Sequence, residues 1–165
     1  MSDVITGLFK NPAEASAAIT MLEHKGFSDA NISLVANDSI TKDSFALTEH
    51  SKLPEGVAIG ASSGGVLAAI VGGLAAVGVV ATGGVGVLAS GPLVAALAAG
   101  GAGAAAGGII GGAIGLAIPE HEVKFYEDAI KEGSVLVGVH YDNSDQKDLI
   151  KETFKHFDDV KVASA

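Results

Sequence analysis

The sequence predicts an α+β protein in which a ferredoxin-like split βαβ domain is interrupted by a long Gly/Ala-rich helical hairpin. Three observations predict this fold. Each end of the chain contains a strand, a helix and a second strand in that order. Residues 56–119 contain no charged residue and no histidine, and they hold most of the 23 glycines. The predicted division is therefore 1–54 for the first half of the domain with a polar loop, 55–119 for the hairpin, and 120–165 for a helix and the second half.

The amino-terminal βαβ unit begins with a short apolar strand at Val4–Phe9. Residues 11–14, Asn-Pro-Ala-Glu, are the types preferred at a helix start: an N-cap, a proline in the first turn, and a glutamate that can reach back to the cap. Gly26 is a typical helix C-terminal signal, and Ile32–Ala36 is the next predicted strand. The polar residues 37–54 are predicted to form a loop.

The carboxyl-terminal unit repeats this order. Val135–Tyr141 is predicted as a strand, and residues 143–146, Asn-Ser-Asp-Gln, again combine an N-cap with an amide side chain at the third position. The following helix buries Leu149, Ile150, Thr153 and Phe154, and Val160–Val162 alternates like a strand. Two βαβ units in one chain predict a single sheet with helices on one face.

Neither flank alone contains enough apolar side chains for a core, so the two flanks are expected to meet in one sheet. The apolar run then leaves the sheet and returns to the same edge. The predicted shared core consists of Ile5, Leu8, Ile19, Leu22, Phe27, Ile32, Leu34, Leu136, Val139, Leu149, Ile150, Phe154 and Val162. A further helix is predicted over Glu120–Lys131, with Val123, Tyr126 and Ile130 along one face.

The apolar run is predicted to form two helices, Gly56–Val80 and Gly91–Ile118, joined by a turn region at Ala81–Ser90. Ser90 is a candidate cap for the second helix, and Pro92 lies near its start. At about 1.5 Å per residue, each helix would be roughly 37–42 Å long. The hydrocarbon core of a bilayer is about 30 Å thick, so both helices could span it.

Glycines recur at every fourth residue in the apolar run and predict a helix-packing surface. Such a glycine zipper lets helix backbones approach closely, which is how helices associate in lipid. The predicted packing and oligomerisation residues are Gly60, Gly64, Gly72, Gly73, Gly103, Gly107, Gly108, Gly111, Gly112 and Gly115. The expected partners are therefore further copies of this chain and a lipid bilayer.

Three other interpretations of the same run stay open. The first is a soluble self-assembling particle in which the hairpins share a core. The second is association with a lipid surface without spanning. The third is a sensor module, because ferredoxin-like pairs often bind small ligands at strand edges. A flexible linker fits poorly, because the run contains many Ile, Leu and Val residues.

The sequence predicts no enzymatic activity. It contains no cysteine, and its five histidines, at positions 24, 50, 121, 140 and 156, form no pattern of three or four converging metal ligands. Glu152 and His156 lie four residues apart on a helix, a spacing that is more often solvated surface than a site. No phosphate-binding loop is present. We expect no cofactor and no bound metal.

Charge and the amino terminus bear on partners and location. The formal net charge is −9, and all ten basic residues are lysines, so nucleic acid is an improbable partner. The first residues, MSDVITGLFKNPAEA, have no basic region and too short an apolar stretch for an export signal. We therefore expect a protein of the inner membrane with its ferredoxin-like domain in the cytoplasm, or else a cytoplasmic particle.

The ordered motifs resemble those of bacterial general stress proteins of the heat-induced, YflT-like family. The matching residues in the first flank are Phe9, Asn11, Glu14, Ala15, Gly26, Phe27, Ser28, Asp29 and Ile32. Further matches are Ile118-Pro119-Glu120, Lys124-Phe125-Tyr126-Glu127 and Gly133-Ser134-Val135-Leu136. The resemblance implies a bacterial protein induced by stress and brings no catalytic residues. Together with the glycine zipper, it predicts a non-enzymatic, stress-related, membrane-associated protein that self-associates.

Overall fold

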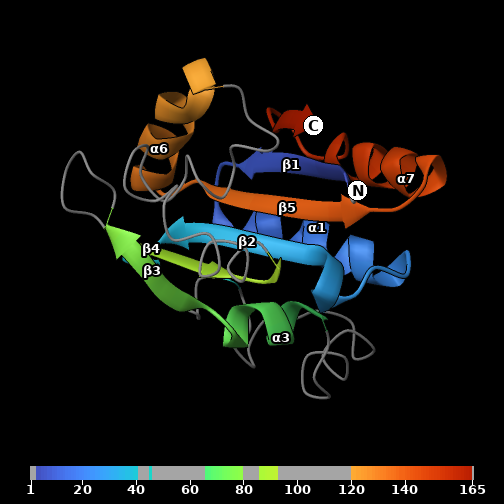
Figure 1. The fold of residues 1–165 in the computed structure, drawn as a ribbon, viewed down its shortest axis with the longest axis horizontal. Coiled ribbons are helices and arrows are strands. Elements are labelled where there is room, and N and C mark those ends of the chain that lie inside the picture. The colour runs from blue at the N-terminus through green and yellow to red at the C-terminus, as the bar shows by residue number, and fades with distance from the viewer. Residues whose placement is uncertain (1–2, 41–44, 46–65, 80–85, 93–119, 165) are drawn as a thin grey trace.

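The computed structural model describes residues 3–40, 45, 66–79, 86–92 and 120–164, and these form an α+β fold (Figure 1). Six strands make one antiparallel sheet in the order β3-β4-β2-β5-β1-β6. Strands from the two ends of the chain alternate at one side of this sheet, in the order β2-β5-β1-β6.

The first βαβ unit follows the prediction closely. It consists of β1 (Asp3–Phe9), α1 (Pro12–His24) and β2 (Ile32–Asn37). Asn11 caps α1, since its Oδ1 accepts a hydrogen bond of 2.9 Å from the Glu14 backbone N–H. The predicted return contact from the Glu14 side chain is not made, because its buried Oε2 has no hydrogen-bond partner in the described part of the chain. Gly26 has the left-handed φ of +96° that a helix C-terminal glycine adopts.

The second unit consists of β5 (Val135–Tyr141), α7 (Ser144–Phe154) and β6 (Lys161–Ser164). Asn143 caps α7 as Asn11 caps α1, with 2.9 Å between its Oδ1 and the Gln146 backbone nitrogen. The Gln146 side chain reaches back, but to the Asp142 N–H at 2.8 Å. The predicted helix at Glu120–Lys131 is a 3₁₀ turn, Glu120–Glu122, followed by α6 (Val123–Lys131).

Part of the predicted helical hairpin is wrong. The helix expected over Gly56–Val80 is described only as α3 (Val66–Gly72), and β3 (Ala75–Val79) follows it. The expected turn region ends in β4 (Gly86–Ser90), which pairs with β3 and with β2. Two adjacent glycines end the helix, and β4, which itself pairs with the edge of β2, gives the Val-rich residues after them a strand to pair with.

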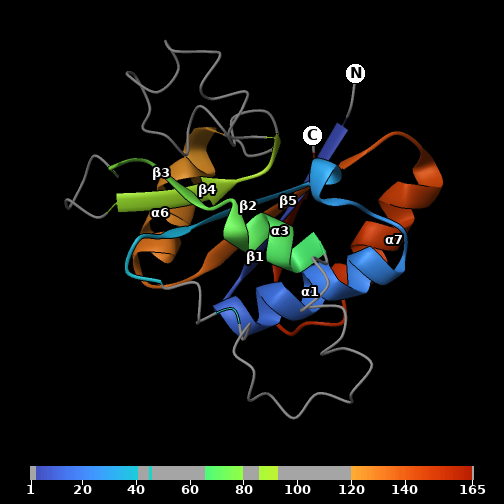
Figure 2. The same cartoon turned by 90° about the horizontal axis from the view of Figure 1, so that it is seen from below.

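The sheet has helices on both faces. On the first face, α1, α3 and α7 cover the larger core (Figure 2). On the second face, Tyr126 and Ile130 of α6 pack on a smaller cluster that includes Leu8, Val35 and Leu136. The predicted core residues are buried, except that Leu149 is partly buried and Val162 is 40% exposed. Within the described residues, no helix is both long enough and apolar enough to cross a bilayer.

Candidate functional site

Two of the ten predicted packing glycines lie in the described part of the chain, at the end of α3. A Cβ built on Gly72 meets nothing within 4 Å, whereas one on Gly73 lies 3.2 Å from the Ala69 carbonyl oxygen and 3.9 Å from Ser90 Cβ. Gly73 therefore fits the corner where α3 turns into β3, and Gly72 faces open space. The other eight, Gly60, Gly64, Gly103, Gly107, Gly108, Gly111, Gly112 and Gly115, lie outside the described residues.

Ser90, the candidate cap of the second predicted helix, lies at the end of β4. Its Oγ is buried and has no hydrogen-bond partner among the described residues, so no capping bond is seen. The next residue, Gly91, has φ of +91°, and a Cβ there would lie 2.3 Å from the Ile32 carbonyl oxygen. The chain thus leaves the sheet through a turn that only glycine fits, tightly against β2.

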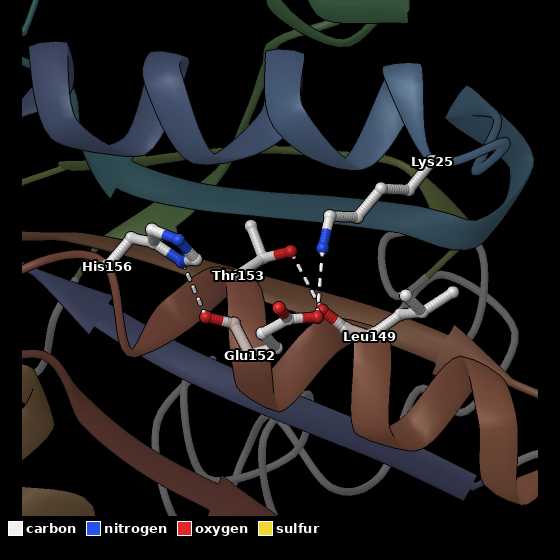
Figure 3. A network of polar contacts seen from close by, with 5 residues as sticks. All are labelled: Lys25, Leu149, Glu152, Thr153 and His156. Carbon is white, nitrogen blue, oxygen red and sulfur yellow. Dashed lines mark hydrogen bonds and ion pairs between the residues drawn. The ribbon is translucent and has the colours of Figure 1, made fainter.

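The pair of Glu152 and His156 serves the packing of helices and forms no acid–base site (Figure 3). His156 Nδ1 lies 2.8 Å from the Glu152 carbonyl oxygen, so this ring nitrogen carries the proton and donates to the end of α7. The Glu152 carboxylate instead pairs with Lys25 Nζ at 3.3 Å. This ion pair joins α7 to the end of α1, and it leaves no carboxylate on the imidazole.

No metal centre forms in the described part of the chain, where no three His, Asp or Glu side chains come together. His24, His121 and His156 are exposed there, and His50 lies outside it. The expectation that Glu152 and His156 lie on a solvated helix surface agrees with the structure, in which both are exposed.

His140 differs from the other histidines, because it lies on the second face of the sheet and is partly buried. Its Nε2 is buried without a hydrogen-bond partner among the described residues. Burial lowers the pKa of His140 below its ordinary value, and nearby Asp142 opposes part of this shift. Burial therefore favours the neutral form of this imidazole.

Two further polar residues share this face. Thr6 and Ser33 both lie directly opposite Gly138 of β5, one on each side, and both side chains are buried. His140 follows two residues along the same strand, opposite Val4. Each of the three strands contributes one of these polar side chains to the face, beside apolar residues such as Leu8 and Leu136, so no single strand indicated it in the sequence. These groups offer hydrogen bonds and no formal charge.

A cluster of charged and aromatic side chains lies at the edge of the sheet, where α6 meets β6. Lys161 Nζ lies 4.4 Å from the centre of the Phe125 ring and 3.1 Å from Glu122 Oε1. Phe125 is 53% exposed although it stacks with this lysine. Burial raises the pKa of neighbouring Tyr126 to about 12, so this phenol stays neutral.

Several residues that carry the resemblance to general stress proteins have structural roles here. Asn11 is a helix cap, Gly26 takes a left-handed turn, and Phe27 is buried in the larger core. The Ser28 N–H donates to Asn31 Oδ1 at 3.3 Å and starts the turn before β2. Comparisons of the chain with protein-family models, with curated proteins and with solved structures gave no match.

Proposed function

We propose that this chain is a non-enzymatic, stress-related protein that associates with further copies of itself through the Gly/Ala-rich segment 93–119. The observation that supports the proposal is the position of the two elements that flank this segment in the sequence. β4 precedes the segment and α6 follows it, and Val87 and Ala89 of β4 share a buried cluster with Tyr126 and Ile130 of α6. One folded domain therefore holds both ends of the segment.

The length of the segment favours packing between protein copies over a pair of membrane spans. A continuous helix over residues 93–119 would be about 40 Å long, so a chain that leaves and returns has about 20 Å in each direction. The hydrocarbon core is about 30 Å thick. A core shared by several copies sets no such minimum length, and this supports the soluble particle.

The composition of the segment supports contacts between backbones. It contains no charged residue, and Gly103, Gly107, Gly111 and Gly115 repeat at the spacing of one helix face. A segment of this kind has no means of staying solvated alone, because its Ile and Leu residues need burial. The same residues in a second copy are the matching surface.

We also infer that the domain carrying the segment is a ferredoxin-like split βαβ. The order β6-β1-β5-β2 within the sheet supports this, since each unit contributes two strands that are separated by a strand of the other unit. The strands β3 and β4 then extend the β2 edge of that core. The stress-related role rests on the ordered motifs of the resemblance.

Two matched double variants test self-association. Gly107→Leu with Gly111→Leu adds bulk to the glycine face, whereas Ile109→Leu with Ile110→Leu preserves volume at neighbouring positions. We expect the glycine pair to lose the large assembly in detergent-free sedimentation velocity, and the isoleucine pair to keep it. Assembly of the glycine pair to the same size as the parent would reject the glycine face as a contact surface.

Membrane attachment is the second candidate, and the uncharged composition of residues 93–119 favours it. In this form, the segment inserts part-way into the inner membrane from the cytoplasmic side. Flotation of the purified chain with phospholipid vesicles tests it. Recovery with the vesicles supports attachment, and a particle that stays at the bottom of the gradient with unchanged size rejects it.

A further inference from the structure

In the part of the chain that the structure describes, the outer edge of β6 combines an unpaired strand with an exposed apolar side chain. Among the described residues, β6 pairs with β1 alone, and its Val162 is 40% exposed. Val162 lies opposite Gly7, which has no side chain to cover it. A Cβ on Gly7 would approach Phe154 Cε2 to 2.8 Å, so both Gly7 and Val162 belong to the face that carries α7.

The lysine charge that would discourage a second strand from pairing with this edge lies on the other face of the sheet. Lysine on an edge strand discourages pairing with a second strand. Here Lys161 lies on the opposite face, stacked on Phe125 and paired with Glu122. The edge therefore presents one positive and one negative charge that balance each other, although the whole chain has a formal net charge of −9.

We propose that the β6 edge is a docking surface for the β6 edge of a second copy of this chain. Two antiparallel edge strands related by a two-fold axis keep their faces aligned only if residues of the same face oppose each other. An axis at Val162 satisfies this condition. It places Val162 against the partner copy's identical residue and Lys161 against the partner's Ala163.

This register is self-complementary in both polarity and charge. Two exposed valines cover each other on one face, and cross-strand pairs of β-branched residues are favourable. On the other face, each copy brings the same neutral pair of Lys161 and Glu122 to the shared edge. A standard interface buries about 800 Å² of surface on each partner. Four residues per strand bury far less surface than this, so the pairing is weak and depends on protein concentration.

The contact uses a different part of the molecule from segment 93–119 and does not rest on assembly through that segment. It joins two sheets edge to edge, whereas the proposed function joins the Gly/Ala-rich segments. The two contacts can therefore be broken separately.

The absence of native cysteine allows a sharp test, because one introduced thiol is then the only thiol in the chain. In Val162→Cys, the two sulfurs face each other across the axis, and opposed Cα atoms 4.5–5.5 Å apart suit a disulfide. In Ser164→Cys, the thiol is equally on an exposed position of the same face and strand. Its own copy lies roughly 13 Å further along the paired strands, beyond disulfide reach.

We expect Val162→Cys to form a covalent dimer under mild oxidation roughly tenfold faster than Ser164→Cys, as read on non-reducing gels. Added salt should speed the reaction, because it screens the repulsion between two acidic chains. Equal rates for the two variants, or a faster rate for Ser164→Cys, would overturn the proposed register. To check that the reduced Val162→Cys protein folds, its thermal unfolding midpoint is compared with that of the parent, and the two should be equal.

A second arm separates this contact from the proposed function. Val162→Cys is combined with Gly107→Leu and Gly111→Leu, and the oxidation is repeated. An unchanged rate of cross-linking in this background supports an edge contact that stands alone, whether or not the large assembly is lost. Loss of cross-linking in this background would overturn the edge contact and assign the parent's dimer to assembly through residues 93–119.

Discussion

Two glycines with similar left-handed backbones have very different surroundings. Gly26 has φ of +96° with nothing within 4 Å of a built Cβ, whereas Gly91 has φ of +91° and would place its Cβ 2.3 Å from the Ile32 carbonyl oxygen. Gly26→Ala therefore meets only the strain of the left-handed region, about 1–2 kcal/mol. Gly91→Ala meets the same strain and a backbone clash.

We expect Gly91→Ala to lower the free energy of unfolding by at least about 1 kcal/mol more than Gly26→Ala does. Urea unfolding of the two variants beside the parent measures this difference. Equal losses would mean that β4 and β2 can move apart at this turn without cost.

The partly buried imidazole of His140 makes stability depend on pH with a definite sign. Its pKa in the folded protein lies below the ordinary value near 6.5. As the pH falls through that value, the unfolded chain takes up the proton first, and the folded state loses stability until the lowered pKa is reached. Above the ordinary pKa, both states are neutral and the contribution vanishes.

We expect His140→Gln to reduce this acid destabilisation. The loss of unfolding free energy between about pH 7.5 and about pH 5 should be smaller in the variant than in the parent, in matched urea titrations. A larger or equal loss in the variant would contradict a neutral, buried imidazole. His24→Gln is the control, because this side chain is exposed at the end of α1.

At the scale of elements, the two helix caps are the clearest correspondence between sequence and structure. Asn11 and Asn143 each accept a hydrogen bond of 2.9 Å from the backbone N–H three residues later. We expect Asn11→Ala and Asn143→Ala each to cost about 1 kcal/mol of unfolding free energy, and the double variant about 2 kcal/mol. Chemical denaturation checks both values, and Asn→Ser at the same positions should restore most of the loss.

The sequence predicted elements well where local signals were strong and poorly where they were absent. Caps at Asn11 and Asn143, the stop at Gly26 and the apolar strand at Val135–Tyr141 are local features, and the structure agrees with each. Residues 75–79, Ala-Ala-Val-Gly-Val, are apolar on every side, so they fit a buried strand as well as a helix. Only the pairing with β4, which in turn lies on the edge of β2, decides between these states, and it is a tertiary feature.

At the scale of the whole molecule, the position of a residue in the sheet order decides its exposure. Val162 alternates like a core residue and was predicted to be buried, but β6 is the outermost strand and its neighbour is Gly7. The polar face of Thr6, Ser33 and His140 was missed for a related reason. Its members come from three strands. The strand register that brings two of them beside Gly138 cannot be predicted from any one segment of the sequence.

At the same scale, we expect the folded domain to extend beyond the boundary predicted at residue 54. Because α3, β3 and β4 pack on the sheet, we expect a chain that joins residues 1–92 to 120–165 through about ten Gly/Ser residues to fold cooperatively. A chain that joins 1–54 to 120–165 loses these elements, with Ile70, Val71 and Val87 of the buried clusters, and exposes the β2 edge. Thermal unfolding followed by circular dichroism compares the two, and a lower midpoint for the longer chain would reject the new boundary.

The place of β1 between β5 and β6 has a consequence for synthesis on the ribosome. The side chain of Thr6 donates to the carbonyl of Ala163, a contact between residues 157 apart in the chain. During synthesis, β1 therefore lacks both of its neighbouring strands, β5 and β6, until almost the entire polypeptide has emerged. During that time the uncharged residues 56–119 are already outside the exit tunnel and have no completed sheet to pack against. Contacts of such high sequence separation close slowly, so apolar residues of the nascent chain stay without their native neighbours until its last strands arrive.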